Sequence, residues 1–281
     1  MPSRDFWAVW ILRGVSELTE GDALSEVWDR VGGLEMHGWV GTAGDPEGER
    51  AAIVLVHGLG VSTAYLMPTM RRLARRYRVY APDLPGFGRS QKPVRTMGIE
   101  KLSEALVGWM EARGVGRAVL VCNSMGCQVA VDLAVKRGEM VEGLVLSGPT
   151  MDPAAGSAFM QILRLLKDAM RESASLWMLA AFDYVRAWPL RVLESLRMAI
   201  ADHVERKLPL VKAPTLVVRG STDPIASRRW VEEMVRLLPN GRLAEIGGTG
   251  HAVNYSAPEE FVALIEEFVG ERVEKAERSV E

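Results

Sequence analysis

Short apolar runs alternate with longer segments in which apolar residues recur every three or four positions. The runs at 51–56, 118–122 and 141–146 contain no polar interruption, which is typical of strands buried on both faces of a parallel sheet. The segments at 99–113 and 229–238 have helical spacing. This alternation of strand and helix predicts an α/β domain built on a mostly parallel sheet.

The N-terminal part of this pattern differs, because apolar and polar residues alternate one by one at 26–31 and 34–40 around Gly32 and Gly33. Such alternation predicts two strands joined as a hairpin. The other predicted elements are helices at 68–77 and 258–269 and strands at 78–82, 214–220 and 242–246.

Strand signals stop between Asp152 and Lys207, where the chain is apolar and helical. We interpret this segment as an insertion of several helices over the end of the sheet. The predicted division is therefore a core at 1–151 and 208–281 and a helical cap at 152–207. The large apolar cap residues Met160, Trp177, Phe182 and Trp188 are candidates for the wall of a substrate site.

Composition excludes some classes of function. The 281 residues are 48% hydrophobic and 25% charged, and the formal net charge is −2, so nothing favours nucleic-acid binding. The spacing of Cys122 and Cys127 suits small buried side chains better than a disulfide or a metal site. The apolar stretch at 6–12 is too short to span a membrane, and we expect a cytoplasmic protein. The sequence leaves open whether the protein forms a homodimer.

The stretch Cys122-Asn123-Ser124-Met125-Gly126 joins a buried strand to a helix. A sharp turn that presents a serine between strand and helix is a nucleophile elbow, and it requires small residues two positions to either side. Gly126 meets this requirement, and Cys122 stands where a glycine is usual.

A nucleophilic serine needs a base and a group that orients the base. His251 and Asp223 each follow a predicted parallel strand, so both are expected at the same sheet edge as Ser124. Asp152, which follows another strand, is the less favoured candidate for the acid. The backbone N–H groups of Met125 and Leu59 are candidates for an oxyanion hole.

Together these motifs resemble the α/β-hydrolase superfamily over nearly the whole chain. The matching stretches are 57–60, 83–90, the elbow, 220–224 and 250–251. The resemblance implies a three-layer α/β sandwich with about eight strands and a helical cap. It also implies that His57 holds the oxyanion loop, where Gly58 lets the backbone approach the substrate. A serine nucleophile argues against dehalogenase and epoxide-hydrolase chemistry.

Within the superfamily, Asn123-Ser124-Met125-Gly126 is similar to the elbow of the meta-cleavage-product hydrolases, which cut carbon–carbon bonds. That similarity implies that Asn123 lines the substrate site. The chain departs from that group at Cys122 and Cys127, and at Ala252, where those enzymes usually carry tryptophan after the histidine. They also use a cap arginine, for which the chain offers Arg164, Arg171, Arg186 and Arg191.

The leading hypothesis is a serine carboxylesterase that acts on small to medium apolar esters through an acyl-enzyme. Ser124, Asp223 and His251 are the predicted catalytic residues, and Gly58, Asn123 and Ala252 join the cap residues as predicted substrate contacts. No metal or organic cofactor is expected, and the expected partner is a small-molecule substrate. The alternatives are a carbon–carbon bond hydrolase and a non-catalytic ligand-binding protein of the same fold.

Overall fold

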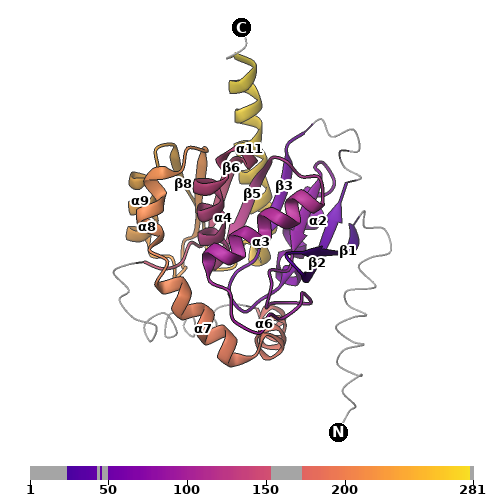
Figure 1. The fold of residues 1–281 in the computed structure, drawn as a ribbon. Coiled ribbons are helices and arrows are strands. Elements are labelled where there is room, and N and C mark those ends of the chain that lie inside the picture. Colours follow the sequence, from indigo (N-terminus) through magenta and orange to yellow (C-terminus); the bar gives the residue numbers. More distant parts are fainter. Residues whose placement is uncertain (1–23, 43–44, 46–49, 153–172, 279–281) are drawn as a thin grey trace.

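An eight-stranded sheet forms the centre of the structure, a computed structural model that describes residues 24–42, 45, 50–152 and 173–278. The strand order is β1-β2-β4-β3-β5-β6-β7-β8 (Figure 1). The strands are β1 Leu24–Val31, β2 Leu34–Gly41, β3 Ala52–Val56, β4 Val79–Pro82, β5 Ala118–Asn123, β6 Val141–Ser147, β7 Thr215–Gly220 and β8 Gly241–Ile246.

The sheet is parallel from β4 to β8, as the uninterrupted apolar runs predict. All residues of β3 and β5 are buried, because helices cover both faces of the sheet. The hairpin is confirmed: β1 pairs antiparallel with β2, which is in turn antiparallel to β4. Gly32 and Gly33 both have positive φ, which a two-residue turn of this kind requires.

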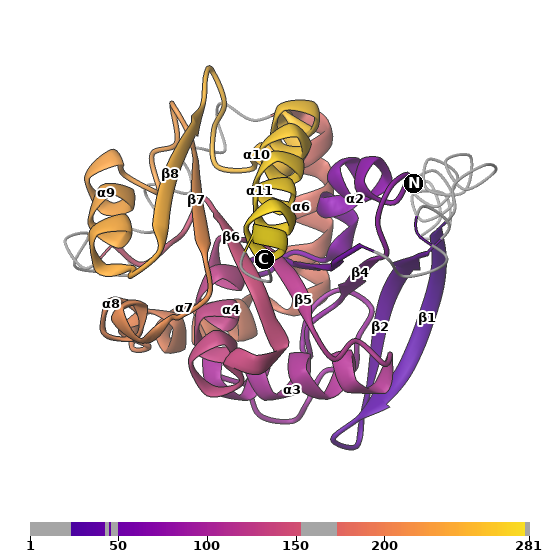
Figure 2. The same cartoon turned by 90° about the horizontal axis from the view of Figure 1, so that it is seen from above.

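The helices form a layer on each side of the sheet, which Figure 2 shows from above. The core on one face contains side chains of α3 (Ile99–Ala112), α4 (Met125–Lys136) and α9 (Arg228–Leu237). The other core contains side chains of η1 (Thr63–Leu66), α2 (Met67–Leu73), α10 (Val253–Ser256) and α11 (Pro258–Arg278). The predicted three-layer α/β architecture is therefore confirmed.

Two helices differ from the sequence-based bounds. The helix predicted at 68–77 ends at Leu73 and continues to Tyr77 as turns, since Arg76 N–H donates to the carbonyl of Leu73. The final helix, predicted to end near 269, extends to Arg278. Its added residues are mostly Glu, Arg, Lys, Val and Ala, and most of these favour a helix without needing core contacts.

The cysteines are free and buried, as predicted, and burial raises the pKa of both thiols. Cys127 Sγ lies 3.4 Å from the carbonyl oxygen of Ser147, so its thiol has a local hydrogen-bond acceptor. None of the helices in the described part of the chain combines the length and apolar character needed to cross a membrane.

In the described part of the chain between β6 and β7, α6 (Ala174–Ala187) and α7 (Pro189–Ile200) lie beyond the end of the sheet, and α8 (Val204–Lys207) packs beside α4 (Figure 1). Their place in the chain agrees with the expected insertion, whose bounds remain a prediction. The apolar stretch at 6–12 and the candidates Met160, Arg164 and Arg171 lie outside the described residues.

A buried hydrogen bond joins α6 to the start of η1. Ser62 caps η1 and donates its hydroxyl to Asp183 Oδ2 on α6 at 2.6 Å. Burial raises the pKa of Asp183 to about 6, although the bond from Ser62 acts in the opposite direction. The ionised carboxylate therefore costs folding free energy at neutral pH, and the hydroxyl offsets part of this cost.

This cost predicts a pH-dependent effect of Asp183→Asn. The folded-state pKa is raised above 3.8, so the carboxyl contributes stability that is present below pH 4 and lost as the pH rises through 6. The asparagine cannot ionise and still accepts from Ser62. Its stability relative to wild type should rise by up to about 3 kcal/mol between pH 4 and pH 8, measured by urea unfolding.

A second variant checks the same contact. Ser62→Ala removes the donor, so it should destabilise the protein more at pH 8 than at pH 5. If the stability difference between Asp183→Asn and wild type is the same at every pH, Asp183 does not carry this effect.

Candidate active site

Three loops that carry the predicted site residues follow neighbouring or nearby parallel strands. Ser124 comes directly after β5, Asp223 lies three residues after β7, and His251 lies five residues after β8. Because these strands run in one direction, their carboxyl ends meet at one edge, where ligands of open α/β sheets bind. The fold thus brings the three residues together.

The elbow has the expected strained backbone. Ser124 has φ 58° and ψ −126°, and its N–H donates to the carbonyl of Ser147 at 3.0 Å. A Cβ on Gly126 would lie 2.6 Å from the carbonyl oxygen of Val56, so only glycine fits at that position. Cys122 is fully accommodated in the buried strand. From residue 118 to residue 134, Ser124 is the one residue that is partly exposed, and the others are buried.

The Asp223 carboxylate is held by its own loop. Its Oδ1 accepts hydrogen bonds from the N–H groups of Ile225 and Ala226, at 2.7 and 3.0 Å. Its Oδ2 lies 2.9 Å from His251 Nδ1. Arg219 donates to the carbonyl oxygens of Asp223 and Ala226, which fixes the loop. One carboxylate oxygen is therefore anchored, and the other is directed at the imidazole.

Asp152, the rival acid, has a different partner. Its Oδ2 accepts from the hydroxyl of Ser227, the N-cap residue of α9, at 3.1 Å. The position of Asp223 against the imidazole agrees with the preference for Asp223 over Asp152. Gly148 explains how the histidine fits, because a Cβ there would lie 2.9 Å from His251 Nδ1. The end of β6 therefore packs directly on the imidazole ring.

The loop that carries Leu59 is fixed by His57. The ring donates through Nδ1 to the carbonyl of Gly58 and accepts the N–H of Leu84 at Nε2, both at 2.8 Å. Burial lowers the pKa of His57, so the ring is neutral and this tautomer is defined. Phe87 packs edge-on against the ring, with ring centroids 5.8 Å apart. The structure therefore gives His57 the supporting position that the resemblance implies.

The loop at 83–90 is in turn fixed by Asp83. This buried carboxylate accepts from His37 Nδ1 and from the N–H groups of Thr63 and Arg89, each at 2.8 Å. Burial alone would raise the pKa of Asp83, but His37 and these donors lower it to about 2. Sequence analysis assigned no role to His37, because a lone histidine on an alternating strand carries no motif.

A relay of hydrogen bonds joins the loop at 57–60, the elbow and the histidine loop. Gly58 N–H donates to the hydroxyl of Tyr65, which donates to Asn123 Oδ1, both at 2.9 Å. Asn123 Nδ2 lies 3.2 Å from the carbonyl oxygens of Ser147 and His251. The Asn123 amide is thus occupied by internal partners. Sequence analysis missed Tyr65, because a tyrosine in a short helix has no recognisable spacing to the elbow.

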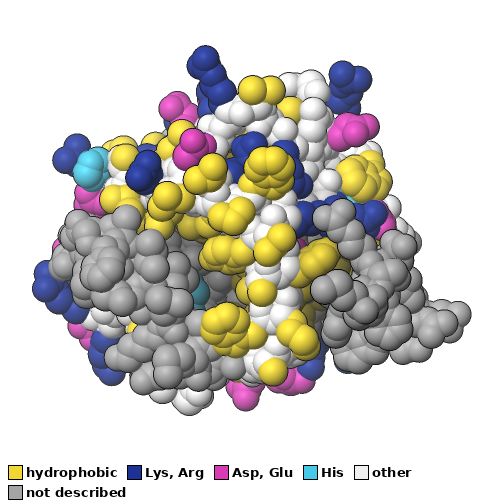
Figure 3. Space-filling model, turned by 90° about the horizontal axis from the view of Figure 1, so that it is seen from below, with side chains coloured by type: hydrophobic (Ala, Val, Ile, Leu, Met, Phe, Trp, Pro, Cys, Tyr) yellow, Lys and Arg dark blue, Asp and Glu magenta, His cyan; other side chains and the backbone are white. Residues whose placement is uncertain are grey.

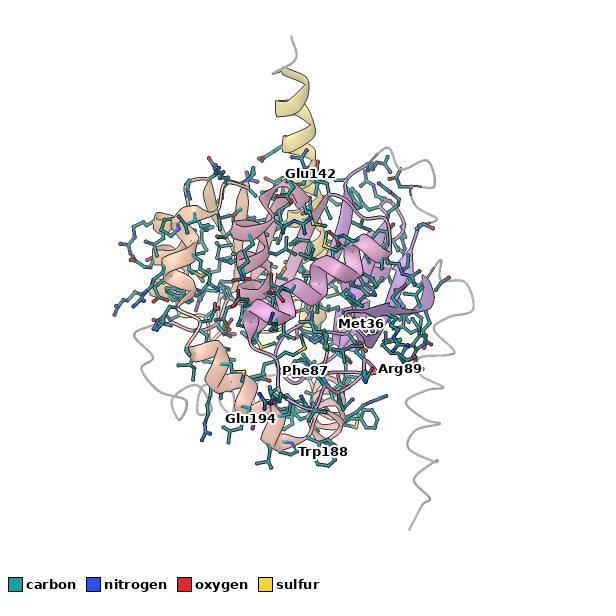
Figure 4. The ribbon with its side chains drawn as sticks, viewed as in Figure 1. Met36, Phe87, Arg89, Glu142, Trp188 and Glu194 are labelled. Atoms are coloured by element: carbon teal, nitrogen blue, oxygen red, sulfur yellow. The ribbon has the colours of Figure 1, made fainter. Side chains whose placement is uncertain are left out.

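The cap candidates are largely exposed. Trp188 is 70% exposed, and Figure 4 shows it at the far end of the cap, pointing away from the sheet. Trp177 and Phe182 are also exposed. The cap residue that meets the oxyanion loop is instead Tyr184, whose ring lies 2.9 Å from a Cβ built on Gly60. The positions of the three exposed residues therefore do not support a role as pocket wall.

With the geometry established, comparison with known proteins identifies the family. The model of the alpha/beta hydrolase family matches residues 53–264, which is well over half of the chain. The chain belongs to the alpha/beta hydrolase family. Its eight-stranded, mostly parallel sheet with covering helices is the fold of that family.

A hydrolase, a polyketide synthase and one solved structure are among the similar proteins. Over 78% of its length, the chain is 29% identical to a 2-hydroxy-6-oxononadienedioate/2-hydroxy-6-oxononatrienedioate hydrolase of Burkholderia vietnamiensis, of which it covers 86%. It is also 29% identical, over 82% of its length, to part of polyketide synthase ThaQ of Burkholderia thailandensis, of which it spans only 12%. The crystal structure of a membrane phospholipase A shares 26% identity and a TM-score of 0.79, covering 95% of this chain and 93% of that one.

These findings support the resemblance stated from the elbow. A relationship to carbon–carbon bond hydrolases within the alpha/beta hydrolase family is confirmed by the similar Burkholderia vietnamiensis enzyme. Family membership does not determine which reaction this chain catalyses, because proteins of similar identity to it are named for different activities.

The close contact of the Asp223 and His251 loops predicts a strong effect of Gly220→Ala. A Cβ on Gly220 would lie 2.1 Å from the carbonyl oxygen of Gly250, next to His251. The methyl group should separate the two loops and destabilise the protein by about 1–3 kcal/mol. Gly247→Ala is the control, because its Cβ meets nothing within 4 Å. Equal unfolding midpoints for the two variants in guanidinium would contradict the prediction.

The relay predicts that Tyr65→Phe lowers the turnover number more than it changes KM. The variant leaves Gly58 N–H without its acceptor and Asn123 Oδ1 without its donor, at a cost of about 1–3 kcal/mol. Hydrolysis of a short-chain aryl ester should show a kcat reduced by ~10–100-fold, since the loops lose their fixed spacing.

Tyr255→Phe is the matched control, because the Tyr255 hydroxyl donates to the hydroxyl of Ser175 at the surface of the protein. It should keep the wild-type kcat. A Tyr65→Phe enzyme that loses stability but keeps the wild-type kcat would limit the hydroxyl to a role in folding.

Proposed function

We propose that the protein is a serine carboxylesterase that acts on small to medium apolar esters. The observation that carries the proposal is the pair formed by Asp223 Oδ2 and His251 Nδ1 at 2.9 Å, at the sheet edge where the accessible Ser124 stands on a strained elbow. The similarity to a phospholipase A supports an ester as the scissile group.

In the proposed mechanism, His251 accepts the hydroxyl proton of Ser124 as Oγ attacks the ester carbonyl carbon. Asp223 holds the imidazole with its N–H toward the carboxylate and stabilises the imidazolium. The N–H groups of Leu59 and Met125 stabilise the negative oxygen; Met125 opens α4, where backbone amides have no partner inside the helix. His251 then protonates the leaving alcohol, and water hydrolyses the acyl-enzyme by the reverse sequence.

The proposed substrate contacts follow from the same geometry. A Cβ on Gly58 would lie 2.9 Å from the Ser124 Cβ, so the glycine keeps this approach to the nucleophile open. Ala252 is buried beside the histidine and adds a small apolar surface. Asn123 contributes by fixing the elbow, because its amide already binds Ser147, His251 and Tyr65. The segment at 152–207 is proposed as the cap above this site.

Hydrolysis of a carbon–carbon bond in a dienoic keto acid is the second candidate. It is favoured by the similarity to the hydrolase of Burkholderia vietnamiensis and by the Asn123-Ser124-Met125-Gly126 elbow. Parallel assays with an aryl ester and with such a dienoic acid separate the two reactions, since only one of them should reach a kcat/KM above 10⁴ M⁻¹s⁻¹, the lower end for typical enzymes.

The decisive variant is Ser124→Ala, which should lower ester turnover by ~10⁴–10⁶-fold, because it removes the proposed nucleophile that forms the acyl-enzyme. A fluorophosphonate probe should label the wild type at Ser124 and leave this variant unlabelled. Ser25→Ala, an exposed serine on β1, is the control and should be labelled as wild type. Unchanged turnover in the Ser124→Ala variant would refute the proposed function.

A further inference from the structure

The outer side of the cap carries a group of exposed large apolar side chains, which we call the cap face. Figure 3 shows apolar side chains gathered in a band on the side of the molecule seen from below, where α6 and α7 lie. Between 42% and 74% of each side chain in this group is exposed. The cap face consists of Trp177, Met178, Phe182, Val185, Trp188 and Leu190.

The spacing on α6 shows that this exposure is a property of one helix face. Leu176, Asp183 and Ala187 are buried against the core, and they recur at intervals of seven and four residues. Met178, Phe182 and Val185 recur at intervals of four and three residues and are exposed. The helix therefore buries one side and presents a second apolar side outward. Exposed apolar groups of this kind mark interaction sites.

Basic residues outnumber acidic ones next to the cap face, although the whole chain has a formal net charge of −2. Within the described segments 91–97 and 173–197, the basic residues are Lys92, Arg95, Arg186, Arg191 and Arg197. The acidic residues are Asp183 and Glu194, whose carboxylate accepts from the Thr96 hydroxyl. Asp183 is the buried carboxylate that Ser62 binds, so it is not presented outward.

The two segments are held together. Arg191 Nη2 donates to the carbonyl of Pro93 at 2.7 Å, which joins α7 to the loop that carries Lys92 and Arg95. Burial lowers the pKa of Lys92, and the charges of Arg186 and Arg191 lower it further, as expected of cations in close proximity. Lys92, Arg186 and Arg191 thus form one basic cluster beside the apolar group.

We propose that the cap face docks on an anionic phospholipid surface. Aromatic and aliphatic side chains enter the boundary between headgroups and acyl chains, where tryptophan is favoured, and the exposed Arg95 and Arg186 contact the phosphates. A second copy of the chain is a poorer occupant, because a two-fold contact places the basic cluster opposite itself. This inference goes beyond the proposed function, because docking uses none of the catalytic residues.

The position of the cap face gives docking a consequence for access to the site. Tyr184 and Asp183, on the inner side of the same helix, contact the oxyanion loop at Gly60 and the adjoining Ser62. The helix that meets the lipid is therefore the helix that contacts the loop of the proposed oxyanion hole. Membrane docking would place the site close to esters dissolved in the bilayer.

Flotation of the full chain with lipid vesicles tests the proposal. Wild-type protein should float with vesicles of phosphatidylglycerol and phosphatidylcholine, and at least tenfold less with vesicles of phosphatidylcholine alone. The triple variant Val185→Gln, Trp188→Asn and Leu190→Gln should bind the anionic vesicles at least tenfold more weakly. Asparagine suits the positive φ of residue 188, and glutamine preserves the helices.

Matched control variants distinguish docking through the cap face from non-specific hydrophobic binding to vesicles. Leu210→Gln and Leu243→Gln remove exposed apolar residues outside the cap face and should float as wild type. Arg186→Glu should weaken binding to anionic vesicles only, and added salt should reduce the difference between vesicle types. Circular dichroism and thermal melting establish that each variant is folded.

Three results would overturn the proposal. Wild type that does not float with anionic vesicles shows that the cap face is not a lipid site. A folded triple variant that floats as well as wild type places the lipid contact elsewhere on the chain. A wild-type dimer that the triple variant converts to a monomer, with no vesicle binding by either, assigns the cap face to a second copy. None of these results depends on ester hydrolysis.

Discussion

The positive φ of Ser124 is the constraint on which the rest of the site depends. A non-glycine residue in this conformation costs of order 1–3 kcal/mol and persists only where the surroundings fix it. Here the N–H of Ser124 is bound to the carbonyl of Ser147 on β6, and Gly126 allows α4 to begin against the end of β3. Ser124 is the one partly exposed residue in the otherwise buried segment 118–134. The strained backbone conformation therefore makes Ser124 accessible to solvent.

Buried polar groups around the elbow fix the distances between its loops. Asp83 binds His37 on β2 and the N–H of Thr63 in η1, and so holds the loop at 83–90 against both. His57 binds the N–H of Leu84 in that loop and the carbonyl of Gly58, which fixes Gly58 in turn. Tyr65 and Asn123 connect Gly58 to the histidine loop. A buried group without a partner costs more than a made bond gains, so each of these contacts strongly favours one arrangement. The geometry at Ser124 is therefore determined largely by residues that do not take part in the proposed chemistry.

The strands, and the sheet edge at which Ser124, Asp223 and His251 lie, could be predicted from the local pattern of the sequence. Runs such as 118–122 predict buried parallel strands, and the parallel direction alone brings Ser124, Asp223 and His251 to one edge. The supporting contacts were out of reach, because Tyr65 lies 58 positions from Asn123 and no periodicity links them. Tyr65 and Asn123 meet only because the fold brings η1 against the elbow. His37 was missed for the same reason, since Asp83 is 46 positions away.

The cap shows a different limit of pattern reasoning. Apolar residues occur around nearly the whole circumference of α6, so their spacing does not reveal which of them face the core. We expected Trp177, Phe182 and Trp188 inside, yet the buried positions include the carboxylate Asp183, bound by Ser62. A polar bond thus fixes the rotation of the helix about its axis. With that rotation fixed, the large apolar side chains face outward, where water is an unfavourable neighbour and a lipid surface is a favourable one.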